Sequence, residues 1–143
     1  MNVRVTGVVI EEGRILLLDQ GQGGSWLLPG GEVDQAETLA DALVRQLHDQ
    51  TGADVSVGRL LYLCDRGTGD ESSSTNVFFV ATLIGGDVGE AVVDAKTRPL
   101  GGVQFVEIAD LPEYGFSSTF MDLASAGFPG AGSYMGATLN LGL

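Results

Sequence analysis

The sequence predicts an α/β protein of the α+β type, in which a mixed β-sheet is flanked by helices. Three observations lead to this class. Short runs rich in β-branched and aliphatic residues recur along the chain, one stretch has the spacing of an amphipathic helix, and the resulting order is β, β, α, β, β, β, α. Because no internal repeat or charged linker divides the 143 residues, we expect a single domain over 1–143.

The chain begins with a predicted hairpin. Residues 3–10 and 14–19 are strand-like and are separated by Glu11-Glu12-Gly13. A glycine-rich stretch at 21–25 then predicts a loop, which either connects strands or borders a ligand pocket; connection is the more common role.

A helix is predicted from about residue 35 to residue 51. Asp34 is expected to cap its start, Gly52 to end it, and Glu37 to complete a reciprocal cap with Asp34. The predicted apolar face consists of Leu39, Ala42, Leu43 and Leu47, which lie three and four residues apart.

The second half of the chain returns to strands. We expect strands at 54–64, 75–84 and 103–108, then a short helix or two within 109–126. The connections at 68–74 and 85–102 are the longest and are candidate pocket rims.

The last segment, about 123–143, forms an uncharged C-terminal extension. It is too rich in Gly, Pro and Asn for a membrane span, and we expect it to pack against the domain or against a partner subunit. A homodimer is therefore one of the expected assemblies.

Charge restricts the class of partner. The chain has 19 acidic and 7 basic residues, a formal net charge of -12. This balance opposes binding to a nucleic-acid polymer, whose affinity comes mainly from Lys and Arg meeting phosphates. A small phosphorylated molecule remains compatible, because a few local arginines or a metal ion offset the global field.

The single cysteine, Cys64, allows no intrachain disulfide and no cysteine-based zinc cluster. No leader-like start and no run of roughly 18 apolar residues is present, so no membrane association is predicted. We expect a cytoplasmic protein with Cys64 as a buried strand residue.

The segment 31–53, GEVDQAETLADALVRQLHDQTGA, places Gly31, Glu37, Arg45, Leu47 and Gly52 at the spacing G-x5-E-x7-R-E-U-x-E-E-x-G-U, where U is a bulky aliphatic residue. This pattern resembles the box of the Nudix (MutT-like) superfamily. The resemblance implies a Nudix fold and hydrolysis of a nucleoside diphosphate linked to another moiety, with Mg²⁺ or Mn²⁺ as cofactor.

The box departs from the family at the three positions where the pattern has metal-binding glutamates, which here are Gln46, Asp49 and Gln50. Their spacing predicts that they share one helical face. A glutamine keeps a carbonyl oxygen but carries no charge and cannot accept a proton as a carboxylate does. Asp49 is then the best remaining metal ligand, and we expect metal binding to be weak.

The resemblance also places Gly30, Gly31 and Glu32 in the metal-facing, ligand-binding loop, although Glu32 equally suits a solvated loop acid. Trp26 is a candidate for stacking on a ligand, as are Tyr62, Phe78 and Phe79, but core packing is the commoner role of such strand aromatics.

Arg45 and Glu37 are expected to organise the box. Arg45 lies four residues from both Asp41 and Asp49, which predicts ion pairs along the helix. His48 occupies a variable box position, and we expect it to face away from the metal site.

A downstream catalytic acid is not identified by any motif. Asp87, Glu90 and Asp94 lie in the long loop where family members often place such a residue, but each also suits a solvated loop charge. Three functions stay open: a weakened Nudix hydrolase, a non-catalytic ligand-binding or regulatory protein, and a non-hydrolytic enzyme on the same fold.

Overall fold

The computed structural model describes residues 2–19, 26–66, 74–88 and 102–143. These residues form an eight-stranded mixed sheet with helices on both sides, as the sequence predicts. The strands are β1 (Asn2–Glu11), β2 (Arg14–Asp19), β3 (Trp26–Leu27), β4 (Gly30–Glu32), β5 (Ala53–Arg66), β6 (Ser74–Gly86), β7 (Val103–Glu107) and β8 (Ser133–Ala137). The helices are α1 (Leu39–Thr51) and α2 (Ser118–Ser125), with 3₁₀ turns η1 (Ile108–Tyr114) and η2 (Thr138–Leu141).

The strand order is β3-β2-β1-β6-β5-β8, with β4 also paired to β1 and β7 to β2. β1 runs parallel to β6, and β5 runs parallel to β8, whereas the other pairs are antiparallel. The predicted N-terminal hairpin is confirmed: Ile10 pairs with Ile15, and the turn places Glu12 and Gly13 at φ 51° and 78°. β1 is therefore one strand of the hairpin and also pairs with β4, the strand that carries the first residues of the box.

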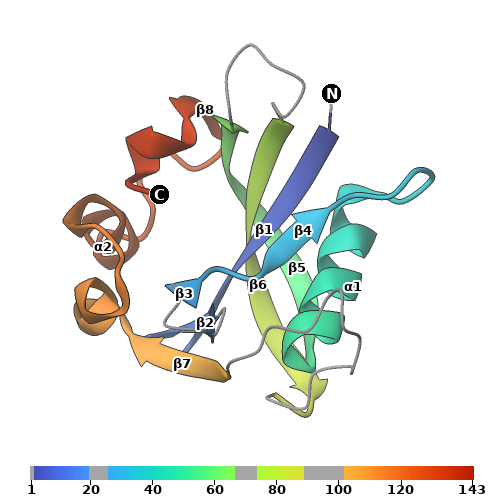
Figure 1. Cartoon of the computed structure of the whole chain (residues 1–143), viewed down its shortest axis with the longest axis horizontal. Helices are drawn as coiled ribbons and strands as arrows, with labels where there is room; N and C mark the ends of the chain where they lie inside the picture. The colour runs from blue at the N-terminus through green and yellow to red at the C-terminus, as the bar shows by residue number, and fades with distance from the viewer. Residues whose placement is uncertain (1, 20–25, 67–73, 89–101) are drawn as a thin grey trace.

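Alternation along β1 divides the core between the two faces of the sheet. Val5 and Val9 pack with Leu43 and Leu47 of α1, whereas Val8 packs in a second cluster on the opposite face. That second cluster includes residues of α2 and the C-terminal segment, which lie across the sheet from α1 in Figure 1. The sheet thus lies between α1 and the layer formed by α2 and the C-terminal segment.

The predicted start of the box helix is wrong. α1 begins at Leu39 rather than near residue 35, and its N-cap is Thr38, whose hydroxyl accepts from the backbone N–H of Asp41 at 3.0 Å. Ala36 has φ 68°, a left-handed conformation that no α-helix can include, so Asp34 cannot be the cap. The predicted end is confirmed, because Gly52 closes the helix at φ 77°.

The three later strands exist as predicted, but two are longer, and β7 ends one residue early at Glu107. β5 and β6 extend to 53–66 and 74–86, so Gly85 and Gly86 belong to a strand rather than to a loop. The remainder of the two candidate pocket rims, 68–73 and 89–101, and the loop at 21–25 lie outside the described residues.

The C-terminal segment completes one edge of the sheet. β8 pairs with β5, Phe128 and Leu141 are buried, and the hydroxyl of Tyr62 donates to the carbonyl of Pro129 at 2.6 Å. None of the described helices is long and apolar enough to span a membrane.

Replacement of Phe128 by Ala tests how much this segment stabilises the domain. The Phe128 ring is 3% exposed and lies against Tyr62 and Phe120, so F128A should lower the free energy of unfolding by about 3 kcal/mol in urea denaturation. Leu139→Ala is the control, because Leu139 is 78% exposed. Equal losses in the two variants would contradict the packing role.

Candidate functional site

The box glutamines lie between α1 and the free edge of β4. β4 pairs with β1 along one edge, with Val5 opposite Gly31. The other edge of β4 faces α1, which lies beside it in Figure 1. Backbone groups on that edge need partners from the helix, since no further strand among the described residues pairs with β4.

Gln50 supplies partners for both backbone groups of Gly30. Its Nε2 donates to the carbonyl of Gly30 at 2.7 Å, and its Oε1 accepts from the N–H of Gly30 at 3.0 Å. The side-chain amide therefore pairs with Gly30 as a neighbouring strand would. This pair uses both functions of the glutamine amide at once.

Gln46 and Arg45 both donate to the backbone carbonyl of Glu32. Gln46 Nε2 donates to the Glu32 carbonyl at 3.0 Å, and Arg45 Nη2 donates to the same oxygen at 3.2 Å. Gln50 Nε2 also contacts Gln46 Oε1 at 3.3 Å, which joins the two amides. We call Gln46, Gln50, Gly30 and Glu32 the amide latch.

The geometry of the amide latch follows from two regular spacings. Four helical residues rise roughly 6 Å, and two residues of an antiparallel strand rise about 6.8 Å. Gln46 and Gln50 therefore match the carbonyls of Glu32 and Gly30, which point to the same edge. The predicted common face of the box positions thus meets backbone carbonyls.

The two glycines allow the helix and the strand to approach. A Cβ on Gly31 would lie 2.5 Å from Gln46 Nε2, and one on Gly30 would collide with the backbone of Val5 and Thr6. Close backbone approach therefore explains both glycines.

Arg45 organises the loop before the helix, but its partners are not those predicted. It pairs with Glu37 at 2.8 Å and with Asp34 at 3.5 Å, and it makes no described salt bridge to Asp41 or Asp49. Glu37 also accepts from the backbone N–H of Asp34 at 3.0 Å, outside the helix, so the reciprocal helix cap is wrong. The hydrogen bond from Arg45, followed by that from Asp34, lowers the pKa of Glu37 to about 2.

The carboxylates near the amide latch do not converge. Asp49 is half-buried on α1 and acts on Arg45 through its charge. Glu32 is opposite Arg4 in the β1–β4 register, so its side chain points to the sheet face away from α1. Within the described ranges no three Asp, Glu, His or Cys residues cluster as metal ligands would.

This donor set does not fit Mg²⁺ or Mn²⁺ as placed. Mg²⁺ needs an octahedron of oxygen ligands, usually including one or two carboxylates. At the amide latch, the amide N–H groups of Gln46 and Gln50 and the Arg45 guanidinium donate to the Glu32 and Gly30 carbonyls, and the positive ends of these donors disfavour a cation beside them. Asp49 alone contributes charge from the three box positions.

Other sequence candidates lie apart from the latch. His48 faces solvent, as expected, with Nδ1 3.0 Å from an Asp54 oxygen. The backbone N–H of Asp87 donates to Gly52, whereas Glu90 and Asp94 lie outside the described residues. Cys64 is buried, and burial raises the pKa of its thiol to about 11, so it is no nucleophile at neutral pH.

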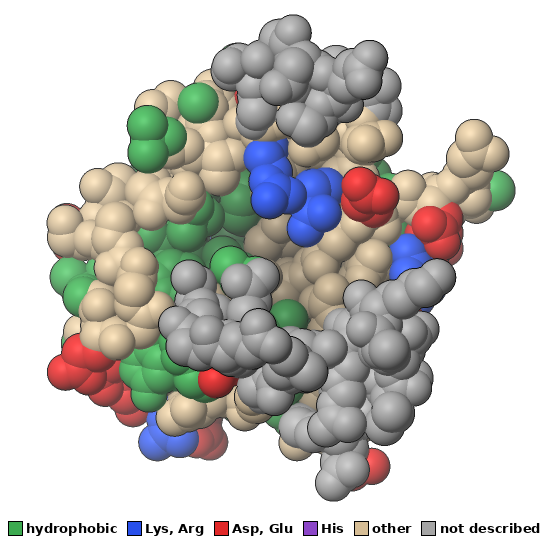
Figure 2. Space-filling model, in the orientation of Figure 1, with side chains coloured by type: hydrophobic (Ala, Val, Ile, Leu, Met, Phe, Trp, Pro, Cys, Tyr) green, Lys and Arg blue, Asp and Glu red, His purple; other side chains and the backbone are tan. Residues whose placement is uncertain are grey.

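A pocket of about 360 Å³ lies on the sheet face opposite α1. Figure 2 shows basic side chains beside an apolar hollow on the visible face. Trp26 and Phe78 line the pocket, whereas Tyr62 and Phe79 do not. The described residues that line it are Arg4, Thr6, Trp26, Leu27, Leu28, Arg66, Asn76, Phe78, Gly115, Phe116, Thr138, Gly142 and Leu143.

Sequence reasoning did not identify Arg4, Arg66 or Asn76. One signal was present: Arg4 and Thr6 alternate with Val3 and Val5 along β1, which marks a polar face on an otherwise apolar strand.

The sheet order, the box helix and its contact with β4 together define a Nudix-type protein. A family model described as the NUDIX domain matches residues 1–123, and the chain belongs to this family. Nudix hydrolases generally use divalent metal ions.

The proteins similar to this chain include two relatives in sequence and one solved structure. The chain is 30% identical over 118 residues to an ADP-ribose pyrophosphatase of Methanocaldococcus jannaschii, covering 80% of this chain and 66% of that protein. It is 38% identical over 60 residues to a MutT-like protein of Streptomyces ambofaciens, covering 41% of this chain and 39% of the relative. The chain thus spans two thirds or less of these relatives. A MutT protein from Bacillus halodurans has the same fold, with TM-score 0.75, 18% identity and coverage of 95% of this chain and 88% of the other.

Gln50→Met tests the amide latch. Methionine keeps the length of the side chain but makes neither hydrogen bond to Gly30, so the free energy of unfolding should fall by about 1–2 kcal/mol in urea denaturation. Leu60→Met, at a position 37% exposed on β5, is the control for the introduction of methionine. Unchanged stability of Q50M would show that the pair to Gly30 contributes nothing.

Glu37→Gln tests the ion pair through pH. The pKa of Glu37 falls from 4.5 to about 2 on folding, so the carboxylate stabilises the fold above pH 4.5, and this contribution disappears as the pH falls toward about 2. E37Q should therefore be less stable than the wild type near neutral pH, with the difference shrinking in acid. Thermal denaturation across this range measures it, and a constant difference would contradict the assignment.

Proposed function

We propose that this protein binds a nucleoside diphosphate linked to another moiety and that metal-dependent hydrolysis at its box is weak. Membership of the family and the pyrophosphatase relative support the ligand class. The observation that carries the second part is the pair between Gln50 and Gly30, in which an amide N–H holds the carbonyl oxygen at 2.7 Å.

A carboxylate at position 50 would behave differently. It could accept from the N–H of Gly30, but its second oxygen would face the Gly30 carbonyl with no proton between them. Such an arrangement is favourable only with a cation bridging the oxygens. Gln50 removes that requirement, because its NH₂ group supplies the missing donor.

Loss of charge also weakens the chemistry. Cleavage of a pyrophosphate needs a nucleophilic water and neutralisation of charge on the phosphates, which in metal-dependent hydrolysis the metal supplies. Gln46 and Gln50 cannot accept a proton from water, and their amides already bond to backbone carbonyls and to each other. Asp49 is the remaining candidate metal ligand, because the side chain of Glu32 points to the other face of the sheet.

The second candidate function is non-catalytic: a Nudix-fold protein that binds its ligand as a sensor or regulator. The same amide latch favours it, because the latch closes the edge of β4 without a metal. No set of described residues marks a non-hydrolytic reaction, so that alternative has no support of its own.

A panel assay separates the two functions. The protein is incubated with ADP-ribose, UDP-sugars and other nucleoside diphosphate derivatives in Mg²⁺ or Mn²⁺, and both phosphate products and binding are measured. We expect binding with slow turnover, whereas binding with no detectable turnover would favour the non-catalytic function. Rapid turnover of any panel member would contradict weak hydrolysis, and binding of none would contradict the ligand class.

Gln46→Glu combined with Gln50→Glu tests the cause of the weakness. The double variant loses the donors to Gly30 and Glu32 and gains two carboxylates beside Asp49, so it should unfold at a lower temperature without metal and be stabilised by Mg²⁺. Pyrophosphatase activity should appear or rise. Calorimetry and product release measure these effects.

Asp49→Asn in the double variant should remove most of the gain in metal affinity. If the folded double variant binds Mg²⁺ no better than wild type, the three positions do not form a metal site. If it binds metal without turnover, residues outside the box limit hydrolysis.

A further inference from the structure

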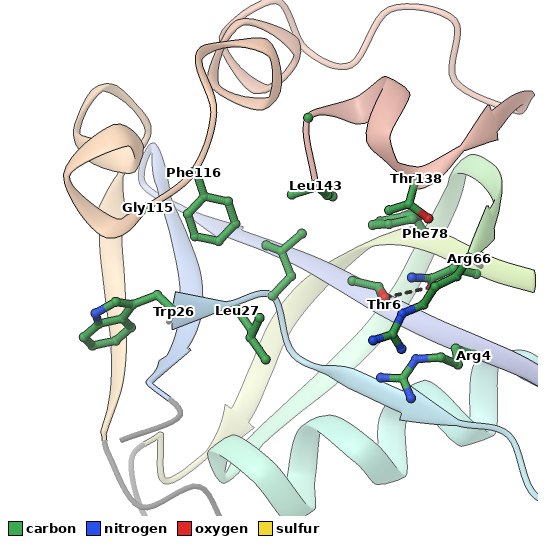
Figure 3. A pocket seen from close by; sticks show the side chains of 13 residues that line it. Arg4, Thr6, Trp26, Leu27, Arg66, Phe78, Gly115, Phe116, Thr138 and Leu143 are labelled. Carbon is green, nitrogen blue, oxygen red and sulfur yellow. Dashed lines mark hydrogen bonds between the residues drawn. The ribbon is translucent and has the colours of Figure 1, made fainter. Parts of the chain in front are cut away.

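The pocket opposite α1 collects positive charge in an acidic protein. Arg4 from β1 and Arg66 from the end of β5 extend their guanidinium groups toward the same space (Figure 3). The chain has only 7 basic residues against 19 acidic ones. Two of these 7 basic residues therefore lie at one pocket. The acidic overall composition does not explain why they lie together.

Neither arginine has a salt bridge within the part of the chain that the structure describes. Burial, and after it the charge of Arg66, lowers the pKa of Arg4. Glu32 acts on Arg4 in the opposite direction but forms no ion pair with it. Among the described residues, the two like charges thus have little local compensation, an arrangement that a bound anion would stabilise.

Asn76 adds a third donor at the same place. It is directly opposite Arg4 in the β1–β6 register and is 8% exposed. Thr6 donates its hydroxyl to Asn76 Oδ1 at 2.9 Å, which leaves the Nδ2 group as donor. Among the described residues Nδ2 has no acceptor, although buried polar groups are nearly always paired. A ligand oxygen would satisfy it.

The other end of the pocket is apolar. Trp26 and Phe116 line this end, and Leu143 from the C-terminal segment lies near Phe116 in Figure 3. A planar or apolar group fits between such side chains. Thr138 and Leu143 lie outside residues 1–123 that match the family model, so these parts of the pocket lining come from the C-terminal segment.

We infer that this pocket binds a phosphate or diphosphate group without a metal ion, through Arg4, Arg66 and Asn76, and holds the attached apolar or planar group against Phe116 and Leu143. Guanidinium groups suit this task, since each presents paired N–H donors to phosphate oxygens. The inference deepens the proposed function and rests on it for the nucleoside part of the ligand. It places recognition on Arg4 and Arg66 rather than on a cation held by the box.

The single tryptophan gives a direct readout. Trp26 lines the pocket and no other tryptophan is present, so its fluorescence reports on occupancy. We would titrate ADP-ribose, ADP and inorganic pyrophosphate in EDTA, following Trp26 fluorescence and calorimetric heat. Wild type should bind at least one of them without metal, and Arg4→Gln and Arg66→Gln should each weaken that binding about tenfold.

Arg14→Gln is the matched control. Arg14 pairs with Glu107 on the exposed surface at 3.1 Å and does not line the pocket, so the variant removes the same charge elsewhere and should bind as wild type does. Arg66 is exposed, so R66Q keeps the test valid if R4Q folds poorly. If R14Q weakened ligand binding as much as R4Q and R66Q do, the effect would come from the net charge of the protein, and the inference would be overturned.

The probes distinguish the inference from the proposed function. Nucleotide binding that neither R4Q nor R66Q weakens overturns this site and leaves the proposed function standing. Pyrophosphate binding lost in both variants, with no binding of ADP or ADP-ribose, supports the anion site and contradicts the nucleoside. Absence of binding by every probe in EDTA overturns metal-free recognition; if binding then appears with Mg²⁺, the proposed ligand class survives.

Discussion

The pairing of Gln50 with Gly30 is the contact on which the arrangement of the box depends. Through two hydrogen bonds the helix side chain completes the open edge of β4, and Gln46 with Arg45 extends the contact to the Glu32 carbonyl. Each neutral amide both donates and accepts, so the oxygens of the strand need no cation between them. The alignment of α1 with β4 thus depends in part on amide N–H donors to the Glu32 and Gly30 carbonyls, which glutamates at positions 46 and 50 could not supply.

The loop before α1 is held by a separate set of contacts, which centre on Glu37. Ala36 breaks the helical backbone with φ 68°, and Glu37 joins the N–H of Asp34 to the guanidinium of Arg45. Arg45 therefore links α1 to the loop through Glu37 and to β4 through the carbonyl of Glu32. The family positions Glu37 and Arg45 keep an organising role here, whereas two of the three positions associated with metal binding are the neutral Gln46 and Gln50 and only Asp49 carries charge.

The sheet places the box and the pocket on opposite faces of β1. Val5 faces α1, and its neighbours Arg4 and Thr6 face the pocket. Strand alternation thus separates the amide latch from the arginine pair while keeping both within a few residues of β1. With this layout, substitutions at the box positions do not alter the residues that line the pocket. The pocket can therefore keep its arginines whatever residues stand at positions 46 and 50.

The sequence by itself determined the features that depend on neighbours along the chain. Hydrophobic alternation predicts the strands, the Glu12-Gly13 turn joins the first two, and Gly52 ends the box helix, because each reflects local backbone preference. The sequence pattern did not reveal the helix start at Leu39, after the N-cap Thr38. Tertiary structure decided the partners of Arg45, the role of Gln46 and Gln50, and the meeting of Arg4, Arg66 and Asn76. These depend on how β4 aligns with α1 and on the registers among β1, β5 and β6. Such contacts join residues far apart in the chain, and their spacing in sequence carries no record of which atoms meet.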